Sequence, residues 1–180
     1  MRIKTLSAAL TAFVLIGPTA QVRAADITTV PQTQAGKPVS AKDYEEKAGV
    51  ADLFEVEAGK VALGKSNEKG VKDFAGMMIR DHTDSTNKIK GAVAGNRSLA
   101  VPAKLDAEHE DMLKRLKDAD KNGFDQLYLQ MQLEGHEKAL ALHRGYALGG
   151  EDQNLRKAAA DITPVVQMHV DHLAPLVASK

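Results

Sequence analysis

Apolar side chains recur every three or four residues along most of the chain, the spacing that places them on one face of an α-helix. The pattern predicts helices over 41–65, from 66 or 67 to the glycine-containing stretch 91–95, from near Pro102 to about 117, over 124–148 and over 152–178. No segment of useful length alternates apolar and polar residues, so a β-sheet is not expected. The predicted fold is all-α, an antiparallel four-helix bundle with an additional short helix.

Local signals support the ends of these helices. Ser40 precedes the first helix, where its hydroxyl can accept from free amides of the first turn. Gly149 and Gly150 end the fourth helix. Pro164 lies inside the last helix and removes an amide donor, so a kink is expected about one turn before His169.

The first 24 residues have the pattern of a signal peptide. A short basic start with Arg2 and Lys4 precedes an apolar stretch over residues 6–16, which is too short for a stable membrane anchor, and small residues end at Ala24. Residues 25–40 are polar and contain proline and glycine, as in a flexible tether. We therefore expect an exported, periplasmic protein with a single helical domain over 41–178 and no transmembrane segment after cleavage.

The composition of the chain excludes several classes of function. The whole chain has 24 basic and 24 acidic residues, and loss of the signal's basic residues leaves a small excess of acid. This balance argues against a nucleic-acid partner, which requires a concentrated basic surface. The chain has no cysteine. Thiolate metal sites, thiol catalysis and covalent c-type haem attachment are therefore excluded, and stability must come from packing.

Polar side chains with metal-binding capacity lie on or beside the apolar helix stripes. They are His82, His136 and His169, with Glu57 at the edge of its stripe and His172 as an alternate one turn after His169. If the helices pack as a bundle, these side chains meet inside it. Imidazoles with one carboxylate suit zinc or another divalent metal. A methionine near each histidine (Met78, Met131, Met168) would favour cuprous copper, but methionine at helical spacing is also common core filler, so copper ranks below zinc.

The sequence lacks the motifs of a di-iron centre and of the common catalytic sites. A di-iron bundle needs Glu-x-x-His, whereas Ile79, Leu133 and Val166 precede the three histidines by three residues. Only Asp106 and His109 have acid-x-x-His spacing, within a charged segment where we expect His109 to be exposed. His143 lies two turns beyond His136, at another level of the bundle. No motif indicates a Ser-His-Asp triad or a phosphate-binding loop, so the sequence favours a non-enzymatic role.

Three ordered motifs carry a family resemblance. They are Phe74-Ala75-x-x-Met78-Ile79-x-Asp81-His82-Thr83, then Phe124-Asp125-x-x-Tyr128 ahead of His136, and Pro164 followed by His169. Over about 43–176 the chain resembles the exported bacterial family called domain of unknown function 4142, often labelled as outer membrane proteins. The resemblance implies a ferritin-like helical bundle in the periplasm and no established reaction.

Two hypotheses for the function remain open. In the first, the inward histidines bind a single metal ion. In the second, they form a satisfied polar core, with His82 paired to Asp81, Tyr128 or a backbone carbonyl, and the bundle acts through its surface as an envelope structural or interaction protein. An envelope protein partner and a homo-oligomer are compatible with both.

Overall fold

The computed structural model describes residues 39–179, so the predicted signal peptide and nearly all of the predicted tether lie outside the described residues. The described chain forms five helices: α1 (Ala41–Lys65), α2 (Lys69–Val93), α3 (Ala107–Asp118), α4 (Phe124–Gly149) and α5 (Gln153–Ala178). It contains no strand, which confirms the all-α prediction. None of these helices is sufficiently long and apolar to cross a membrane.

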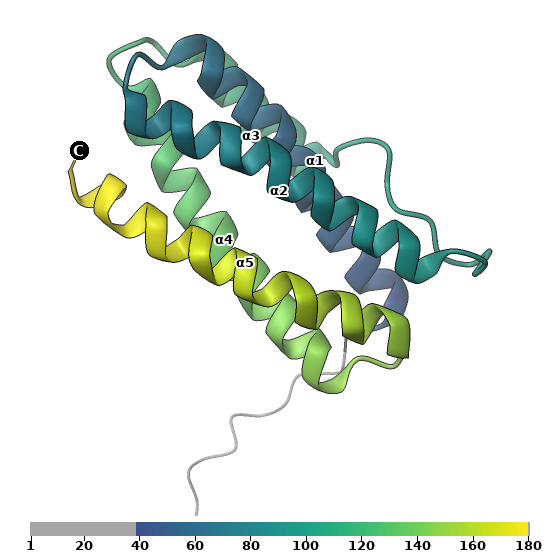
Figure 1. Ribbon diagram of the computed structural model, residues 1–180. Coiled ribbons are helices and arrows are strands. Elements are labelled where there is room, and N and C mark those ends of the chain that lie inside the picture. The colour runs from purple at the N-terminus through teal and green to yellow at the C-terminus, as the bar shows by residue number, and fades with distance from the viewer. Residues whose placement is uncertain (1–38, 180) are drawn as a thin grey trace, which may run out of the picture. The chain divides into compact units, whose positions relative to one another are not determined.

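The four long helices pack mainly as two antiparallel hairpins, α1 with α2 and α4 with α5 (Figure 1). Short connections join the helices within each hairpin, whereas a long loop and α3 link one hairpin to the other. The functional residues described below lie where the two hairpins face each other. The bundle prediction is therefore confirmed, with α3 as the additional short helix.

Capping side chains set the start of three helices. The Ser40 hydroxyl accepts from the Asp43 amide at 3.1 Å, as predicted, and Asp152 caps α5. The third helix begins at Ala107 and not near Pro102, which is a correction to the prediction. Asp106 caps it by accepting from the His109 amide, while Pro102 belongs to the preceding loop.

Two apolar clusters fill the bundle above and below a polar layer. One contains Phe54, Phe74, Met78, Phe124 and Tyr128, together with smaller side chains. The other is built from a second set of buried side chains, including Tyr44, Ile89, Leu155, Ile162 and Val166. Each long helix contributes to both clusters and carries a buried polar residue between them. The polar layer is thus enclosed by hydrophobic packing on both sides.

Helices α1 and α2 approach closely at Gly59. A Cβ atom at this position would lie 2.9 Å from the Ala75 carbonyl oxygen and 2.9 Å from Ile79 Cγ1. A glycine is required there because a larger side chain would push the two helices apart. This close approach brings short side chains of α1 within reach of α2.

Candidate metal centre

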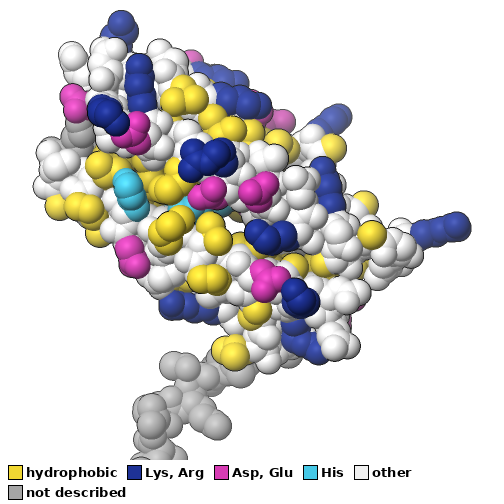
Figure 2. All heavy atoms as spheres, in the orientation of Figure 1, with side chains coloured by type: hydrophobic (Ala, Val, Ile, Leu, Met, Phe, Trp, Pro, Cys, Tyr) yellow, Lys and Arg dark blue, Asp and Glu magenta, His cyan; other side chains and the backbone are white. Residues whose placement is uncertain are grey.

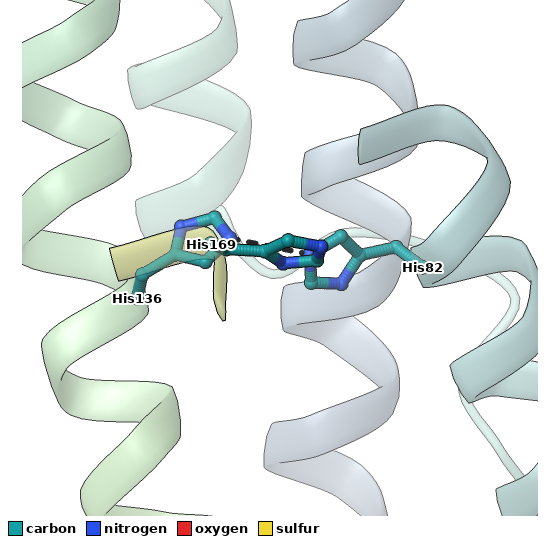
Figure 3. A group of neighbouring side chains, drawn as sticks. All are labelled: His82, His136 and His169. Atoms are coloured by element: carbon teal, nitrogen blue, oxygen red, sulfur yellow. Dashed lines mark hydrogen bonds between the residues drawn. The ribbon is translucent and has the colours of Figure 1, made fainter. Parts of the chain in front are cut away.

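Three buried histidines from three helices meet in the polar layer (Figure 3). His82 comes from α2, His136 from α4 and His169 from α5, and they are 5%, 1% and 1% exposed. Each offers one ring nitrogen within 4.8 Å of the nitrogens of the other two. The Nε2 atoms of His82 and His136 are 3.3 Å apart. The structure therefore brings together the three histidines that the sequence singled out first.

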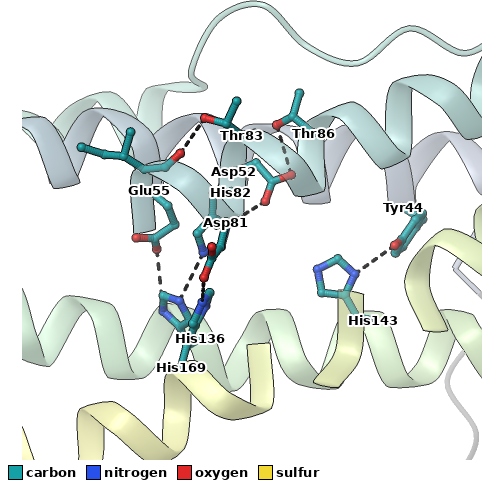
Figure 4. Close-up of polar contacts among 11 residues, drawn as sticks. Tyr44, Asp52, Glu55, Asp81, His82, Thr83, Thr86, His136, His143 and His169 are labelled. Carbon is teal, nitrogen blue, oxygen red and sulfur yellow. Dashed lines mark hydrogen bonds and ion pairs between the residues drawn. The ribbon is translucent and has the colours of Figure 1, made fainter. Parts of the chain in front are cut away.

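Each imidazole is held by an oxygen acceptor on one of its two nitrogens, and Figure 4 shows the carboxylate acceptors of His82 and His169. His82 donates from Nδ1 to Asp52 Oδ1 at 2.8 Å. His136 donates from Nδ1 to the Gln132 carbonyl oxygen at 2.7 Å, and His169 donates from Nε2 to Asp81 Oδ2 at 3.0 Å. Carbonyl and carboxylate oxygens accept and do not donate, so these bonds fix the tautomers. A neutral ring held in this way keeps a lone pair on its other nitrogen.

The second ring nitrogens of the three histidines differ in their partners. Nε2 of neutral His82 faces Nε2 of His136, and Nδ1 of His169 is buried without a hydrogen-bond partner in the structure. Two facing lone pairs at 3.3 Å repel unless a proton or a metal ion lies between them. Metal–nitrogen bonds of about 2.0–2.1 Å at a tetrahedral angle separate two ligand nitrogens by about 3.4 Å. The His82–His136 spacing of 3.3 Å fits this value, and the ligand nitrogen of His169, which lies within 4.8 Å of the other two, needs to move closer by at most about 1.4 Å.

Burial keeps two of the histidines in the form that binds metals. It lowers the pKa of His136 well below its usual value, and the neighbouring His82 and His169 charges act in the same direction. Burial also lowers the pKa of His169 to about 4, although the Asp81 hydrogen bond opposes this shift. Both rings are therefore neutral at neutral pH, as metal ligation requires.

The pKa of His82 is shifted in the opposite direction from those of His136 and His169. Burial works against its protonation, but the hydrogen bond to Asp52 and the charges of Asp52 and Glu55 outweigh it, so the pKa of His82 is raised. Without a metal, a proton on His82 Nε2 can be donated to His136 Nε2. A metal ion between the two nitrogens takes the place of that proton.

Two carboxylates of α1 surround this layer. Asp52, 2% exposed, accepts from His82 and from the Thr86 hydroxyl at 3.2 Å. Glu55, 4% exposed, places Oε1 3.9 Å from His136 Nδ1, while its Oε2 has no hydrogen-bond partner. Burial raises the pKa of Glu55 to about 7, against the opposing charge of His82. The layer thus combines imidazole ligands with acceptors that orient them, an arrangement typical of metal centres.

Two openings lead to the histidines. A groove of about 710 Å³ between α1, α3 and α4 reaches His82 and His136. A pocket of about 70 Å³ between α2 and α5 reaches His82 and His169, with Asp81 and Asp84 at its mouth. Figure 2 shows this second face, where histidine atoms lie in a hollow beside acidic side chains. An ion can approach the cluster from either side.

The structure does not bring Glu57 or His172 into the cluster. The Glu57 side chain is 38% exposed and accepts from Lys60 at 2.7 Å on the outer face of α1. His172 is exposed, and its ring centroid lies 5.9 Å from that of Phe74. Within the bundle, the carboxylates beside the histidines are Asp52, Glu55 and Asp81 instead.

The remaining histidines of the described chain lie apart from the cluster. His143 occupies another level, as predicted, where its Nδ1 is 2.9 Å from the Tyr44 hydroxyl. His109 is half-buried, with its ring 5.4 Å from that of Phe54, so the prediction that it is exposed is wrong. It was expected to be solvated because of the charges around it, but the apolar face of α3 turns it towards α1.

Sequence reasoning missed Asp52 and Glu55, and it considered Asp81 only as one of three alternative partners of His82. Asp81 accepts from His169, whereas His82 is bonded to Asp52. A signal for the α1 acids does exist, because they belong to a stripe of short side chains at spacings of four and three, all of them buried: Ala48, Asp52, Glu55, Gly59 and Ala62. Such a stripe indicates a helix face packed closely on a neighbour, and an acid on it must be buried.

Solved structures with this fold include copper-binding examples. The Cu(II)-bound form of CopM superposes with a TM-score of 0.65 at 18% identity, covering 78% of this chain and 97% of that one. The Cu(I)-bound form of CopM gives a TM-score of 0.65 at 18% identity, with 78% and 96% covered. A DUF305 fragment from Deinococcus radiodurans gives 0.67 at 10% identity, with 80% and 100% covered. At these identities the likeness shows the fold alone.

Sequence comparison identifies the family. No curated protein matches the chain. The family model of DUF4142, described as a domain of unknown function, matches residues 28–176 and confirms the resemblance seen in the three motifs. The chain belongs to the DUF4142 family.

Proposed function

We propose that this protein binds a single divalent transition-metal ion through His82, His136 and His169. The observation that carries the proposal is the arrangement of the ring nitrogens. One nitrogen of each ring donates to an oxygen, and one nitrogen of each ring lies within 4.8 Å of the others. Histidine ligands in metal centres are ordinarily oriented in this way by a second acceptor.

Copper(II) and zinc(II) are the ions that the ligand set favours, since imidazole suits both. The two CopM structures were solved with Cu(II) and Cu(I) bound and share the fold, which supports testing copper beside zinc. A thioether ligand has less support. Met78 and Met131 belong to the apolar cluster below the polar layer, and Met168 is 45% exposed.

The alternative function is a structural or interaction protein with a satisfied polar core. The 3.3 Å contact between His82 and His136 favours it, since a single proton between the two nitrogens would satisfy both. Against it stand buried polar atoms without hydrogen-bond partners, His169 Nδ1 and Glu55 Oε2. Unpaired buried polar atoms are costly, so a cluster that leaves them is better explained as a binding site.

We further propose that the mature protein is exported to the periplasm and has no catalytic reaction of its own. Support for export comes from the signal-like pattern of residues 1–24. The absence of a base-activated nucleophile motif supports the second part. A periplasmic metal-binding bundle, alone or with an envelope partner, fits both statements.

Metal content is the test of this function. Protein purified without an affinity tag is assayed for metals, then titrated with Cu(II) and with Zn(II). We expect one ion per chain, lost in His169→Ala. His172→Ala is the matched control, because this exposed histidine is three residues away on the same helix and should leave binding intact. No stoichiometric ion, together with a melting temperature that neither metal changes, would refute the proposal.

A further inference from the structure

The groove between α1, α3 and α4 is the larger of the two openings, and it gives a small molecule, as well as the metal ion, a route to the histidines. The groove has about ten times the volume of the pocket between α2 and α5, about 710 Å³ against about 70 Å³. On its inner wall lie Asp52, Glu55, His82 and His136. Three histidines leave at least one coordination position of a zinc or copper ion open, and catalytic metal sites keep such a position for water or substrate. The groove reaches two of the three ligands from the side opposite the small pocket.

Glu55 is a buried carboxylate of the groove wall with one oxygen unpaired. The residue is 4% exposed and lines the groove, and its Oε2 has no hydrogen-bond partner. Its Oε1 lies 3.9 Å from His136 Nδ1, the ring nitrogen that is turned away from the metal. The carboxylate is therefore beside the metal layer and not aligned with the three ligand nitrogens. A side-chain hydrogen bond from Gln132 opposes the rise in the pKa of Glu55, and Oε2 is the oxygen of this carboxylate that has no partner.

Gly135 keeps the wall of the groove open beside this carboxylate. It precedes His136 on α4, lines the groove, and a Cβ placed on it would lie 3.6 Å from Glu55 Oε1. That distance is an ordinary contact, so alanine would fit, but a branched or longer side chain would extend into the space next to Glu55. The absence of a side chain at this point leaves room for a small molecule.

We propose that the groove admits a small hydroxylic ligand to the open coordination position of the metal, where its oxygen binds the ion and its O–H donates to Glu55 Oε2. Water has this chemistry, as does a molecule of similar size that replaces it, such as hydrogen peroxide. The inference rests on the proposed metal-binding function.

The residues at the inner end of the groove favour a small hydroxylic ligand over other classes of ligand. An apolar molecule satisfies neither the metal nor the orphan oxygen. Basic and acidic side chains alternate at the rim, including Lys47, Arg115, Lys138, Glu108 and Glu134, so the entrance has no strong preference for one sign of charge. Two properties of a molecule therefore decide whether it binds: its size, and its ability to contact both the metal ion and Glu55 at the inner end of the groove.

Solvent relaxation tests the proposal directly, with water as the probe. The full-length protein is loaded with one equivalent of Cu(II), and the relaxation rate of water protons is compared with that of the Zn(II)-loaded protein, which is diamagnetic. An exchanging water on copper should raise the rate well above the zinc value. Azide should displace this water, so added azide should lower the rate and produce a new copper charge-transfer band.

Substitutions on α4 test whether the ligand enters through the groove. Gly135→Leu fills the groove and should lower the relaxation rate towards the zinc value while copper stays bound. Gly145→Leu is the matched control, because nothing lies within 4 Å of a Cβ at this exposed glycine of the same helix. Ala139→Leu, at a second half-buried groove position, should act like Gly135→Leu if the latter does not fold.

The outcomes separate the two proposals. Copper bound at one equivalent, with a water relaxation rate equal to that of the zinc form and no azide band, would overturn the inference and leave the metal-binding function standing. A folded, copper-loaded Gly135→Leu protein with the wild-type relaxation rate would also overturn it. Failure to bind either metal would refute the proposed function and the inference together.

Discussion

His143 should make the stability of the bundle depend on pH between about 4 and 6.5, independently of any metal. Its Nδ1 lies 2.9 Å from the Tyr44 hydroxyl, and the two side chains are 3% and 0% exposed. Burial raises the pKa of Tyr44, so the phenol keeps its proton and can donate a hydrogen bond to Nδ1 of neutral His143. Protonation of His143 would turn Nδ1 into a donor, so the bond to the hydroxyl would have to reverse, and it would place a charge in the core. Burial accordingly lowers the pKa of His143 to about 4, although the charge of Asp52 opposes the shift.

The sign and size of the effect follow from linkage. A histidine in the unfolded chain titrates near pH 6.5. Between pH 6.5 and 4 the unfolded state therefore binds a proton at this position that the folded state does not. The contribution is complete above pH 6.5 and is lost as the pH falls to about 4. A difference of about 2.5 pKa units corresponds to roughly 3 kcal/mol of unfolding free energy.

The assay is urea unfolding at several pH values from 7.5 to 4.5, on protein treated with a chelator. His143→Gln removes the titrating group, so its unfolding free energy should fall less steeply with decreasing pH than that of the wild type. The exposed His172 provides the control, and His172→Gln should keep the wild-type slope. An equal slope in wild type and His143→Gln would refute the reasoning, as would a His143 pKa near 6.5 measured by NMR in the folded protein.

Asp52→Asn removes the charge that orients His82, and we expect metal affinity in a competition titration to fall about 10–100-fold; unchanged affinity would contradict this role of Asp52. Metal at 100 times its dissociation constant should raise the unfolding free energy by about 2.7 kcal/mol, and excess chelator should remove the gain; identical melting curves with and without metal would count against binding. Gly59→Ala should destabilise the protein by about 1–3 kcal/mol, because its Cβ would lie 2.9 Å from the Ala75 carbonyl oxygen. Gly76→Ala, with nothing within 4 Å, should be neutral or stabilising by up to about 1 kcal/mol, and similar urea midpoints for the two variants would refute the close approach of α1 to α2.

The fold could be predicted because each helix is indicated by its own capping residue and by the spacing of apolar residues within it. The helix predicted over 41–65 is observed at Ala41–Lys65, since Ser40 supplies the cap and apolar spacing continues to the end. The third helix was misplaced at its start because proline is compatible with both a first turn and a loop, and only the Asp106 hydrogen bond decides between them. Where a boundary depends on a capping contact, the sequence offers more than one candidate.

The cluster was predictable only in part, because burial of an acid depends on its neighbours. His82, His136 and His169 lie on apolar stripes, which is sufficient to place them inside a bundle. Glu57 was chosen as the inward acid of the first helix because it follows Phe54 and precedes Val61 at helical spacing. The face of α1 that turns inward is instead the one with small side chains, since they allow the close approach to α2 at Gly59.

Two histidines of α4 show how tertiary contacts separate side chains that look alike in sequence. His136 and His143 are seven residues apart with Leu140 between them, and both are buried. His143 uses Nδ1 to accept from Tyr44, a donor that only the packing of α1 against α4 provides. His136 instead donates from Nδ1 to the backbone of its own helix, so its Nε2 is left for a ligand. The capacity to bind a cation therefore depends on which ring nitrogen the protein already occupies, and this favours His136 over His143 as a ligand of the proposed metal.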